Sequence, residues 1–266
     1  MSVTVSSLYN DSFNFFRNQF AKFILLALIV TVIQVALSLA FQPDISAIFT
    51  KYGLNLTQIA ADLQPGQNEL ILDQQTLMNI IQRLSPEQQM DFARDALAQT
   101  LPFLLMNTFM LMLLIVWTIS FSLMVIQGEN ASIPQAITRS LSVLPKIVIF
   151  TLIYLILLSI GFTLFIVPGI IIYCAFAMTP FIIVATNSSI KKAMRDSSKL
   201  LMRYPLIIIT GVLLSIALPF LVNNVIVSLF NQPLISYSVQ YLVNSLISIL
   251  FTLYFFRLLS LGYQKV

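Results

Sequence analysis

The stretch that decides the fold is Ile147 to Thr186, which reads IVIFTLIYLILLSIGFTLFIVPGIIIYCAFAMTPFIIVAT and contains no charged residue. As one straight helix its 40 residues would extend about 60 Å, twice the hydrocarbon core of a bilayer. Val167, Pro168 and Gly169 interrupt it: proline lacks a backbone donor, and glycine permits a sharp reversal. The stretch therefore predicts two membrane-spanning helices with a structural turn at Pro168 and Gly169.

The rest of the chain has the same apolar character. Of its 266 residues, 58% are hydrophobic and 9% are charged, and the mean hydropathy is +0.92. That much apolar surface cannot be hidden in one soluble core of this size. Long uncharged runs predict six spans in one membrane domain (1–266), at about 23–41, 103–126, 147–167, 170–186, 205–222 and 237–256. The predicted fold class is all-α, a polytopic membrane protein with cytoplasmic juxtamembrane amphipathic helices and a small external helical hairpin.

Basic residues beside the spans predict the orientation, because cytoplasmic loops retain an excess of Lys and Arg. With the amino terminus inside, 11 of the 14 Lys and Arg residues fall in cytoplasmic segments, and both termini are cytoplasmic. The alternative is that the first span is a signal peptide cleaved near Ser38-Leu39-Ala40. It is disfavoured because the 22-residue lead-in is long and amphipathic.

Residues 42–101 form the one sizeable polar region, and we expect them to be an external helical insertion. Ser85-Pro86-Glu87-Gln88 is a capping box with proline at the first helical position, which predicts a helix from Pro86 towards Leu97. Apolar residues recurring at helical spacing between Leu70 and Leu84 predict a second helix before it. This hairpin offers a contact surface for an envelope protein partner.

The acid pair Asp91 and Asp95 lies on one face of that predicted helix. Two carboxylates do not complete a calcium or magnesium site. We therefore expect a solvated face beside Arg94 rather than a metal site.

Each outward-going span is preceded by a segment of similar pattern: a charged residue, serine, two further residues, two apolar residues and then a basic one. The three segments are Asp11–Arg17, Arg139–Lys146 and Asp196–Arg203. They predict three copies of one unit, namely a surface helix, an outward span and a returning span. Chance similarity is the alternative, because amphipathic helices are degenerate patterns.

The third of these segments is the most basic. A helix with such a charged face is expected to lie at the headgroup boundary, where anionic lipid attracts each basic residue by about 1 kcal/mol. The alternative is that these charges only set the orientation of the spans. The candidate lipid-headgroup contacts are Lys191, Lys192, Arg195, Lys199 and Arg203.

Several kinds of activity are excluded or disfavoured. The chain has no histidine, which removes histidine-based triads, haem ligation and most zinc sites. Neither a nucleotide-binding loop nor a nucleophile–base pair is visible, and the lone Cys174 lies in an apolar run. We expect no catalytic, cofactor-binding or metal-binding residues and no enzyme activity. Nucleic acid is not expected as a partner, because basic residues beside spans more often face anionic lipid.

Two prolines fall inside spans. Pro180 and Pro219 are expected to kink the fourth and fifth spans, since each removes a backbone hydrogen bond. Asn223 and Asn224 are expected either to cap the fifth helix or to line a polar pocket.

Five short stretches, in this order and spacing, resemble the YciC family of uncharacterised enterobacterial inner-membrane proteins: Asn14–Phe20, Ser85–Gln89, Leu144–Lys146, Val167–Ile171 and Phe255–Leu258. The resemblance extends over nearly the whole chain. It implies a multi-pass protein of a bacterial inner membrane, and it supplies no catalytic residues.

Two functional hypotheses follow. The first is a non-enzymatic protein that organises or regulates envelope components through the external insertion. The second is a lipid-binding carrier or transporter that uses the basic third surface helix and the kinked spans, with membrane lipids, particularly anionic ones, as its partners.

Overall fold

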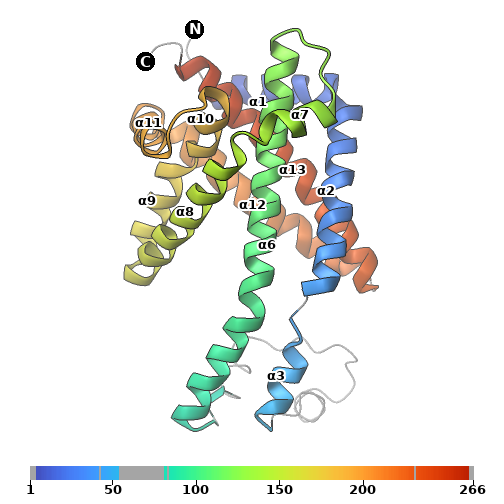
Figure 1. Ribbon diagram of the computed structural model, residues 1–266, viewed down its shortest axis with the longest axis vertical. Helices are drawn as coiled ribbons and strands as arrows, with labels where there is room; N and C mark the ends of the chain where they lie inside the picture. Colours follow the sequence, from blue (N-terminus) through green and yellow to red (C-terminus); the bar gives the residue numbers. More distant parts are fainter. Residues whose placement is uncertain (1–3, 42, 54–80, 83, 231, 264–266) are drawn as a thin grey trace. The chain divides into compact units, whose positions relative to one another are not determined.

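The computed structural model describes residues 4–41, 43–53, 81–82, 84–230 and 232–263, and the chain divides into two compact units. The first unit comprises residues 1–36 and 108–266, and the second comprises residues 37–107. All regular secondary structure in the described residues is helical (Figure 1). Six helices in this part of the chain are long and apolar enough to cross a membrane. The prediction of an all-α protein with six spans is confirmed.

The helices have the following bounds: α1 (Val5–Asn18), α2 (Phe20–Phe41), α3 (Ile45–Lys51), α6 (Pro86–Ile126), α7 (Ile133–Ser140), α8 (Leu144–Leu164), α9 (Ile166–Phe176), α10 (Thr179–Thr186), α11 (Ile190–Arg203), α12 (Pro205–Leu229) and α13 (Pro233–Tyr263). The short helices α1, α7 and α11 are amphipathic, and each precedes a span. Within the first unit, α8 packs against α9, α12 against α13, and α1 against α13.

The chain reverses at Phe165, not at the predicted turn of Pro168 and Gly169. Helix α8 ends at Leu164, Phe165 is extended (φ −164°, ψ 157°), and α9 begins at the next residue. Pro168 therefore lies in the first turn of α9, where backbone N–H groups have no partner within the helix and a missing donor costs little. Gly161 and Gly169 instead permit a close crossing of α8 and α9, because a Cβ on Gly161 would lie 3.0 Å from the Cα atom of Gly169, and a Cβ on Gly169 would lie 2.6 Å from the Cγ atom of Phe162.

The fourth span is interrupted beside Pro180 by a two-residue turn at Ala177 and Met178, and both turn residues keep right-handed helical backbone angles. Helix α9 ends at Phe176 and α10 begins at Thr179, with turn residues between them. Pro180 occupies the first turn of α10, where proline is tolerated for the reason given above. Pro219, in contrast, lies inside α12, which continues past it to Leu229.

Asn223 and Asn224 also lie inside α12, so they do not cap it. The side-chain amide of Asn244 in α13 donates to the side-chain oxygen of Asn223 at 3.1 Å. Asn224 donates to the carbonyl of Phe220, within its own helix, at 2.8 Å. The hydrogen bond between Asn244 and Asn223 therefore joins α12 to α13, whereas Asn224 bonds only to the backbone of its own helix.

The three surface helices begin alike. Their N-cap residues all carry hydroxyls (Thr4, Ser132 and Ser189), and each helix then starts with a β-branched apolar residue. The eighth residue of each helix is a buried serine, and the fourth is a buried apolar residue: Ser12, Ser140 and Ser197, with Leu8, Ala136 and Ala193. All three helices lie at the same end of the first unit (Figure 1). Burial of the same residue type at matched positions favours three copies of one unit over chance similarity.

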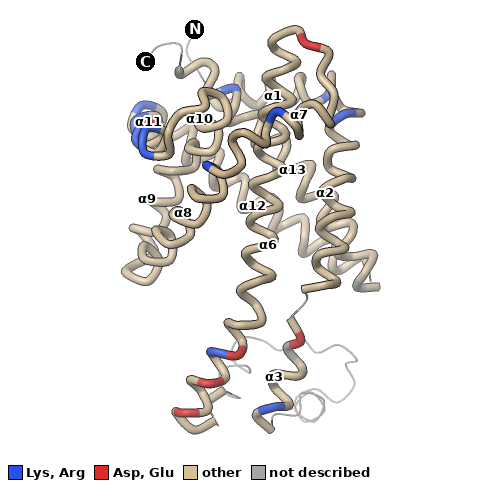
Figure 2. Tube along the Cα trace, viewed as in Figure 1, with Lys and Arg blue, Asp and Glu red and all other residues tan. Residues whose placement is uncertain are grey.

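Lys and Arg residues of the first unit gather at the end that carries α1, α7 and α11 (Figure 2), which we call the basic end. Arg257 of α13 pairs with Asp11 of α1 at 3.2 Å. Lys146 donates to the backbone carbonyl of Asn187 at 2.9 Å and thereby joins the start of α8 to the end of α10. These contacts hold the surface helices against the ends of the spans.

The second unit contains α3 and the first part of α6. Its core is the cluster of Ile48, Phe49, Leu84 and Phe92. Asp95 accepts hydrogen bonds from the Lys51 ammonium and from the Tyr52 hydroxyl, the latter at 2.8 Å. Asp91 is exposed and the pair of Lys51 with Asp95 lies at the surface, as expected of a solvated face, but sequence spacing did not indicate the ion pair.

The sequence predicts two separate helices here, one from Pro86 towards Leu97 and one over 103–126. The structure has one helix instead, α6, whose 41 residues run through Pro102. Strong helix formers on both sides of the proline offset its single missing hydrogen bond. Most of the other predicted external helix, between Leu70 and Leu84, lies outside the described residues.

Candidate functional site

Helix α11 exposes all five basic residues that the sequence singled out: Lys191, Lys192, Arg195, Lys199 and Arg203. The opposite face, with Ala193, Ser197 and Leu200, is buried. The buried residues recur at spacings of three and four, so that one stripe of the helix packs inwards while the charges face outwards.

A hydrogen bond fastens α11 to the break in the fourth span. The hydroxyl of Ser197 donates to the carbonyl of Ala175 at 2.6 Å. Ala175 lies in the last turn of α9, where carbonyl groups lack a partner within the helix. The buried serine of the third surface helix thus satisfies a carbonyl that the break would leave unpaired.

A shallow, open depression of about 420 Å³ lies against α11, and we call it the groove. Lys191 and Arg195, one helical turn apart, line it from α11. The remaining lining is mostly apolar: Ile153 of α8, Phe176 of α9, and Ile190, Met194 and Ser198 of α11. The groove therefore combines two cations with an apolar floor, which is the pattern that an amphiphile with an anionic head requires.

The other three predicted contacts do not line this groove. Lys192 and Lys199 are exposed on α11 outside it, and Arg203 lies over the ring of Tyr204 at 5.5 Å. The structure thus brings two of the five basic residues together with an apolar surface and leaves three apart. Pro168 and Gly169 belong to the hairpin of α8 and α9 and line neither the groove nor the pocket described next.

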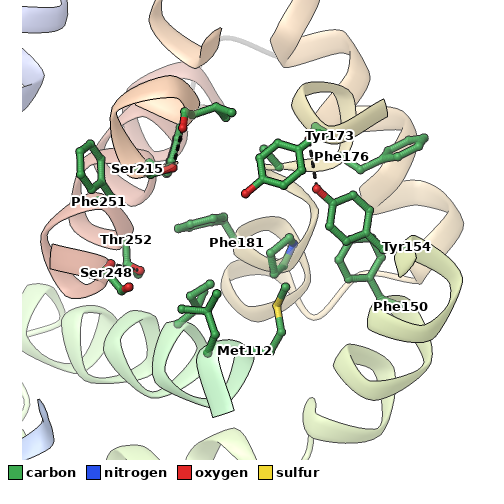
Figure 3. Close-up of a pocket in the computed structure, with 16 residues that line it drawn as sticks. Met112, Phe150, Tyr154, Tyr173, Phe176, Phe181, Ser215, Ser248, Phe251 and Thr252 are labelled. Carbon is green, nitrogen blue, oxygen red and sulfur yellow. Dashed lines mark hydrogen bonds between the residues drawn. The ribbon is translucent and has the colours of Figure 1, made fainter. Parts of the chain in front are cut away.

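A partly open pocket of about 150 Å³, which we call the central pocket, lies in the first unit and is lined by residues of α6, α8, α9, α10, α12 and α13 (Figure 3). None of its described lining residues is charged. Seven of them are aromatic: Phe150, Tyr154, Tyr173, Phe176, Phe181, Phe251 and Phe255. An apolar pocket of this size accommodates a small hydrocarbon group, since an engineered cavity of about 150 Å³ binds benzene.

The hydroxyl groups in this pocket are largely engaged by the backbone. Ser215 donates to the Val212 carbonyl at 2.8 Å, and Thr252 donates to the Ser248 carbonyl at 2.7 Å. The Tyr154 hydroxyl donates to the Tyr173 carbonyl at 3.3 Å (Figure 3). The hydroxyls of Tyr173 and Ser248 add further polarity to a lining that is otherwise apolar.

A third cavity, of about 340 Å³, lies at the basic end between α1 and α13. Its lining includes Asn14, Asn18 and Arg257. The lining of this cavity holds one base, Arg257, and its acidic partner Asp11 at 3.2 Å. The lining of the groove at α11 holds two bases and no acid, although Arg195 lies 3.9 Å from the neighbouring Asp196, so the groove offers more positive charge to an anion.

Sequence reasoning found the basic helix but not the groove or the pocket. Pro180, at which the sequence predicts a kink, lines the pocket, and the break beside that proline is the available signal. Among the described residues, no group of three or more Cys, Asp or Glu side chains is placed to hold a metal ion, and Cys174 is buried.

Comparison with known proteins identifies relatives along the full chain. A family model described as an uncharacterised protein family (UPF0259) matches residues 1–261. A UPF0259 membrane protein of Serratia proteamaculans (strain 568) is 32% identical over 264 residues, covering 98% of this chain and 99% of the relative. A UPF0259 membrane protein of Yersinia pestis (strain Pestoides F) is 32% identical over 263 residues, covering 98% and 96%. No solved structure gives a significant match. The resemblance to an enterobacterial family of uncharacterised membrane proteins is confirmed.

Proposed function

The chain belongs to the uncharacterised family UPF0259, whose curated relatives are named membrane proteins, and on that premise we propose that it is a non-enzymatic inner-membrane protein that binds anionic phospholipid. The basic end faces the cytoplasm in this proposal, as the distribution of Lys and Arg favours. The headgroup lies at Lys191 and Arg195, and the hydrocarbon lies on the apolar floor of the groove.

The observation that carries this proposal is the pairing of charge and apolar surface within one groove. Lys191 and Arg195 lie on the same face of α11 as Met194, and Ile153 and Phe176 complete the floor. A free anion would gain nothing from the floor, and an apolar molecule would gain nothing from the cations. A phospholipid with one anionic phosphate gains from both.

Substitution of the two groove cations gives a test. Each basic residue near an anionic headgroup contributes about 1 kcal/mol, so Lys191→Gln with Arg195→Gln should weaken binding of phosphatidylglycerol roughly thirtyfold. The measurement is native mass spectrometry of the purified full chain during titration with phosphatidylglycerol or with zwitterionic phosphatidylethanolamine. Wild-type protein should retain phosphatidylglycerol selectively.

The matched control is Lys192→Gln with Lys199→Gln, which removes the same charge from the same helix but outside the groove. It should leave the selectivity for phosphatidylglycerol nearly unchanged. Equal losses in both double variants would show that only the overall charge of α11 matters. Equal retention of the two lipids by wild-type protein would also contradict the proposal.

A second candidate function is the organisation or regulation of envelope components through residues 42–101. The observation that favours it is that residues 37–107 form a compact unit with its own apolar core and the ion pair of Lys51 with Asp95. In addition, Met90 is 74% exposed on α6. Native mass spectrometry from native membrane patches should then show a stoichiometric protein partner that Met90→Asp removes. Retention of that partner by the variant would contradict a contact at Met90.

A further inference from the structure

Phe176 is the residue that the groove at α11 and the central pocket share, since it lines both. It is half-buried and is the last residue of α9, directly before the break in the fourth span. Helix α8 also borders both spaces, because Ile153 lines the groove while its neighbour Tyr154 lines the pocket. The two spaces therefore border one another at Phe176 and at neighbouring residues of α8.

The central pocket lies at a distance from the basic end that matches the depth to which a phospholipid acyl chain extends into a bilayer. Its residues Phe150 and Tyr154 are six and ten residues after Leu144, the start of α8 at the basic end, which corresponds to about 9–15 Å along the helix. Val212 and Ser215 lie at a similar distance after Pro205, the start of α12. Half of the hydrocarbon core is about 15 Å. A lipid whose headgroup is at the basic end can therefore reach this pocket from its own leaflet.

The wall between the groove and the pocket lies at a point where the backbone is already broken. Helices α9 and α10 are separated at Ala177 and Met178, and Pro180 cannot donate a hydrogen bond across the break. Ser197 of α11 holds the carbonyl of Ala175 on the same segment. The basic helix is thus fastened directly beside Phe176.

We propose that the central pocket receives the end of an acyl chain of the phospholipid whose headgroup is held by Lys191 and Arg195, and that the chain passes Phe176 to reach it. This rests on the proposed lipid-binding function and adds the route of the chain. The aromatic, uncharged lining of the pocket suits hydrocarbon, and its volume of about 150 Å³ holds the end of a chain rather than a whole lipid. The rest of the acyl chain lies along the groove.

Photocrosslinking tests this route. The full chain is placed in nanodiscs that contain phosphatidylglycerol with a diazirine near the end of one acyl chain, and crosslinked residues are mapped by mass spectrometry. We expect crosslinks to pocket-lining residues of three helices: Met112 of α6, Ser215 of α12 and Ser248 of α13. Crosslinks confined to exposed apolar side chains such as Ile156 and Leu213 would overturn the inference.

Two variants separate this inference from the proposed function. Ser248→Leu places additional carbon atoms in the pocket, so crosslinks there should be lost while native mass spectrometry still shows selective retention of phosphatidylglycerol. Lys191→Gln with Arg195→Gln should lose both. If wild-type protein retains phosphatidylglycerol selectively but gives no crosslinks in the pocket, the inferred route of the acyl chain is wrong while the proposed function stands. If selective retention is absent, the proposed function fails as well.

Discussion

Ser197 illustrates how a single hydroxyl positions the candidate site. Its donation to the carbonyl of Ala175 at 2.6 Å joins α11 to the last turn of α9. An intramolecular hydrogen bond contributes about 1 kcal/mol, and an unpaired buried carbonyl adds to the loss. We therefore expect Ser197→Ala to lower the free energy of unfolding by about 1–2 kcal/mol, as measured by denaturant titration of the purified protein in detergent.

The neighbouring Ser198 provides the control at this scale. Its hydroxyl donates to the carbonyl of Met194 within α11, so Ser198→Ala removes a hydroxyl without separating two helices. Equal destabilisation by both variants would show that the contact between α11 and α9 contributes nothing specific.

At the scale of elements, the packing of α12 against α13 depends on a glycine. A Cβ on Gly211 would lie 2.7 Å from the Cε1 atom of Tyr254 and 3.0 Å from the ring of Phe255, and both aromatic side chains are buried. Tyr254 also donates to the Ile207 carbonyl at 3.1 Å, which fixes its ring against α12. Gly211→Ala should cost about 1–3 kcal/mol of unfolding free energy through overpacking, measured by the same titration.

Gly262→Ala is the comparison on α13, at the contact of that helix with Leu200 of α11 and with Tyr204. A Cβ there would meet the terminal methyl of Leu200 at 3.2 Å and the ring of Tyr204 at 3.3 Å. The methyl group lies at the end of a flexible side chain, so the expected loss is smaller than at Gly211. A loss as large as that of Gly211→Ala would contradict the role assigned to the close approach of α12 and α13.

At the scale of the whole molecule, the testable property is orientation. The spans number six, and the Lys and Arg residues of the first unit gather at one end (Figure 2). With Cys174→Ala as background, a cysteine introduced by Lys192→Cys should react with a membrane-impermeant maleimide only after the membrane is permeabilised. A cysteine introduced by Met90→Cys should react in intact spheroplasts. The reverse pattern would show that the basic end faces outward.

The sequence by itself determined the membrane class, the number of spans and the amphipathic character of α11. These properties follow from local composition and from spacing along one helix, so they need no knowledge of neighbouring elements. The three buried serines were also visible as a repeated pattern, because each occupies the same position in its own helix.

Only the tertiary structure decided how those parts meet. Ile153, Phe176 and Lys191 share a groove although they come from three helices, and Lys51 pairs with Asp95 across 44 positions of sequence. The reversal at Phe165 and the continuity of α6 through Pro102 likewise depended on where helical hydrogen bonds are lost or kept. Local propensity limits the backbone conformations that each residue can adopt. Packing between distant segments then selects one arrangement of the helices, because most of the stabilisation comes from surfaces buried between helices.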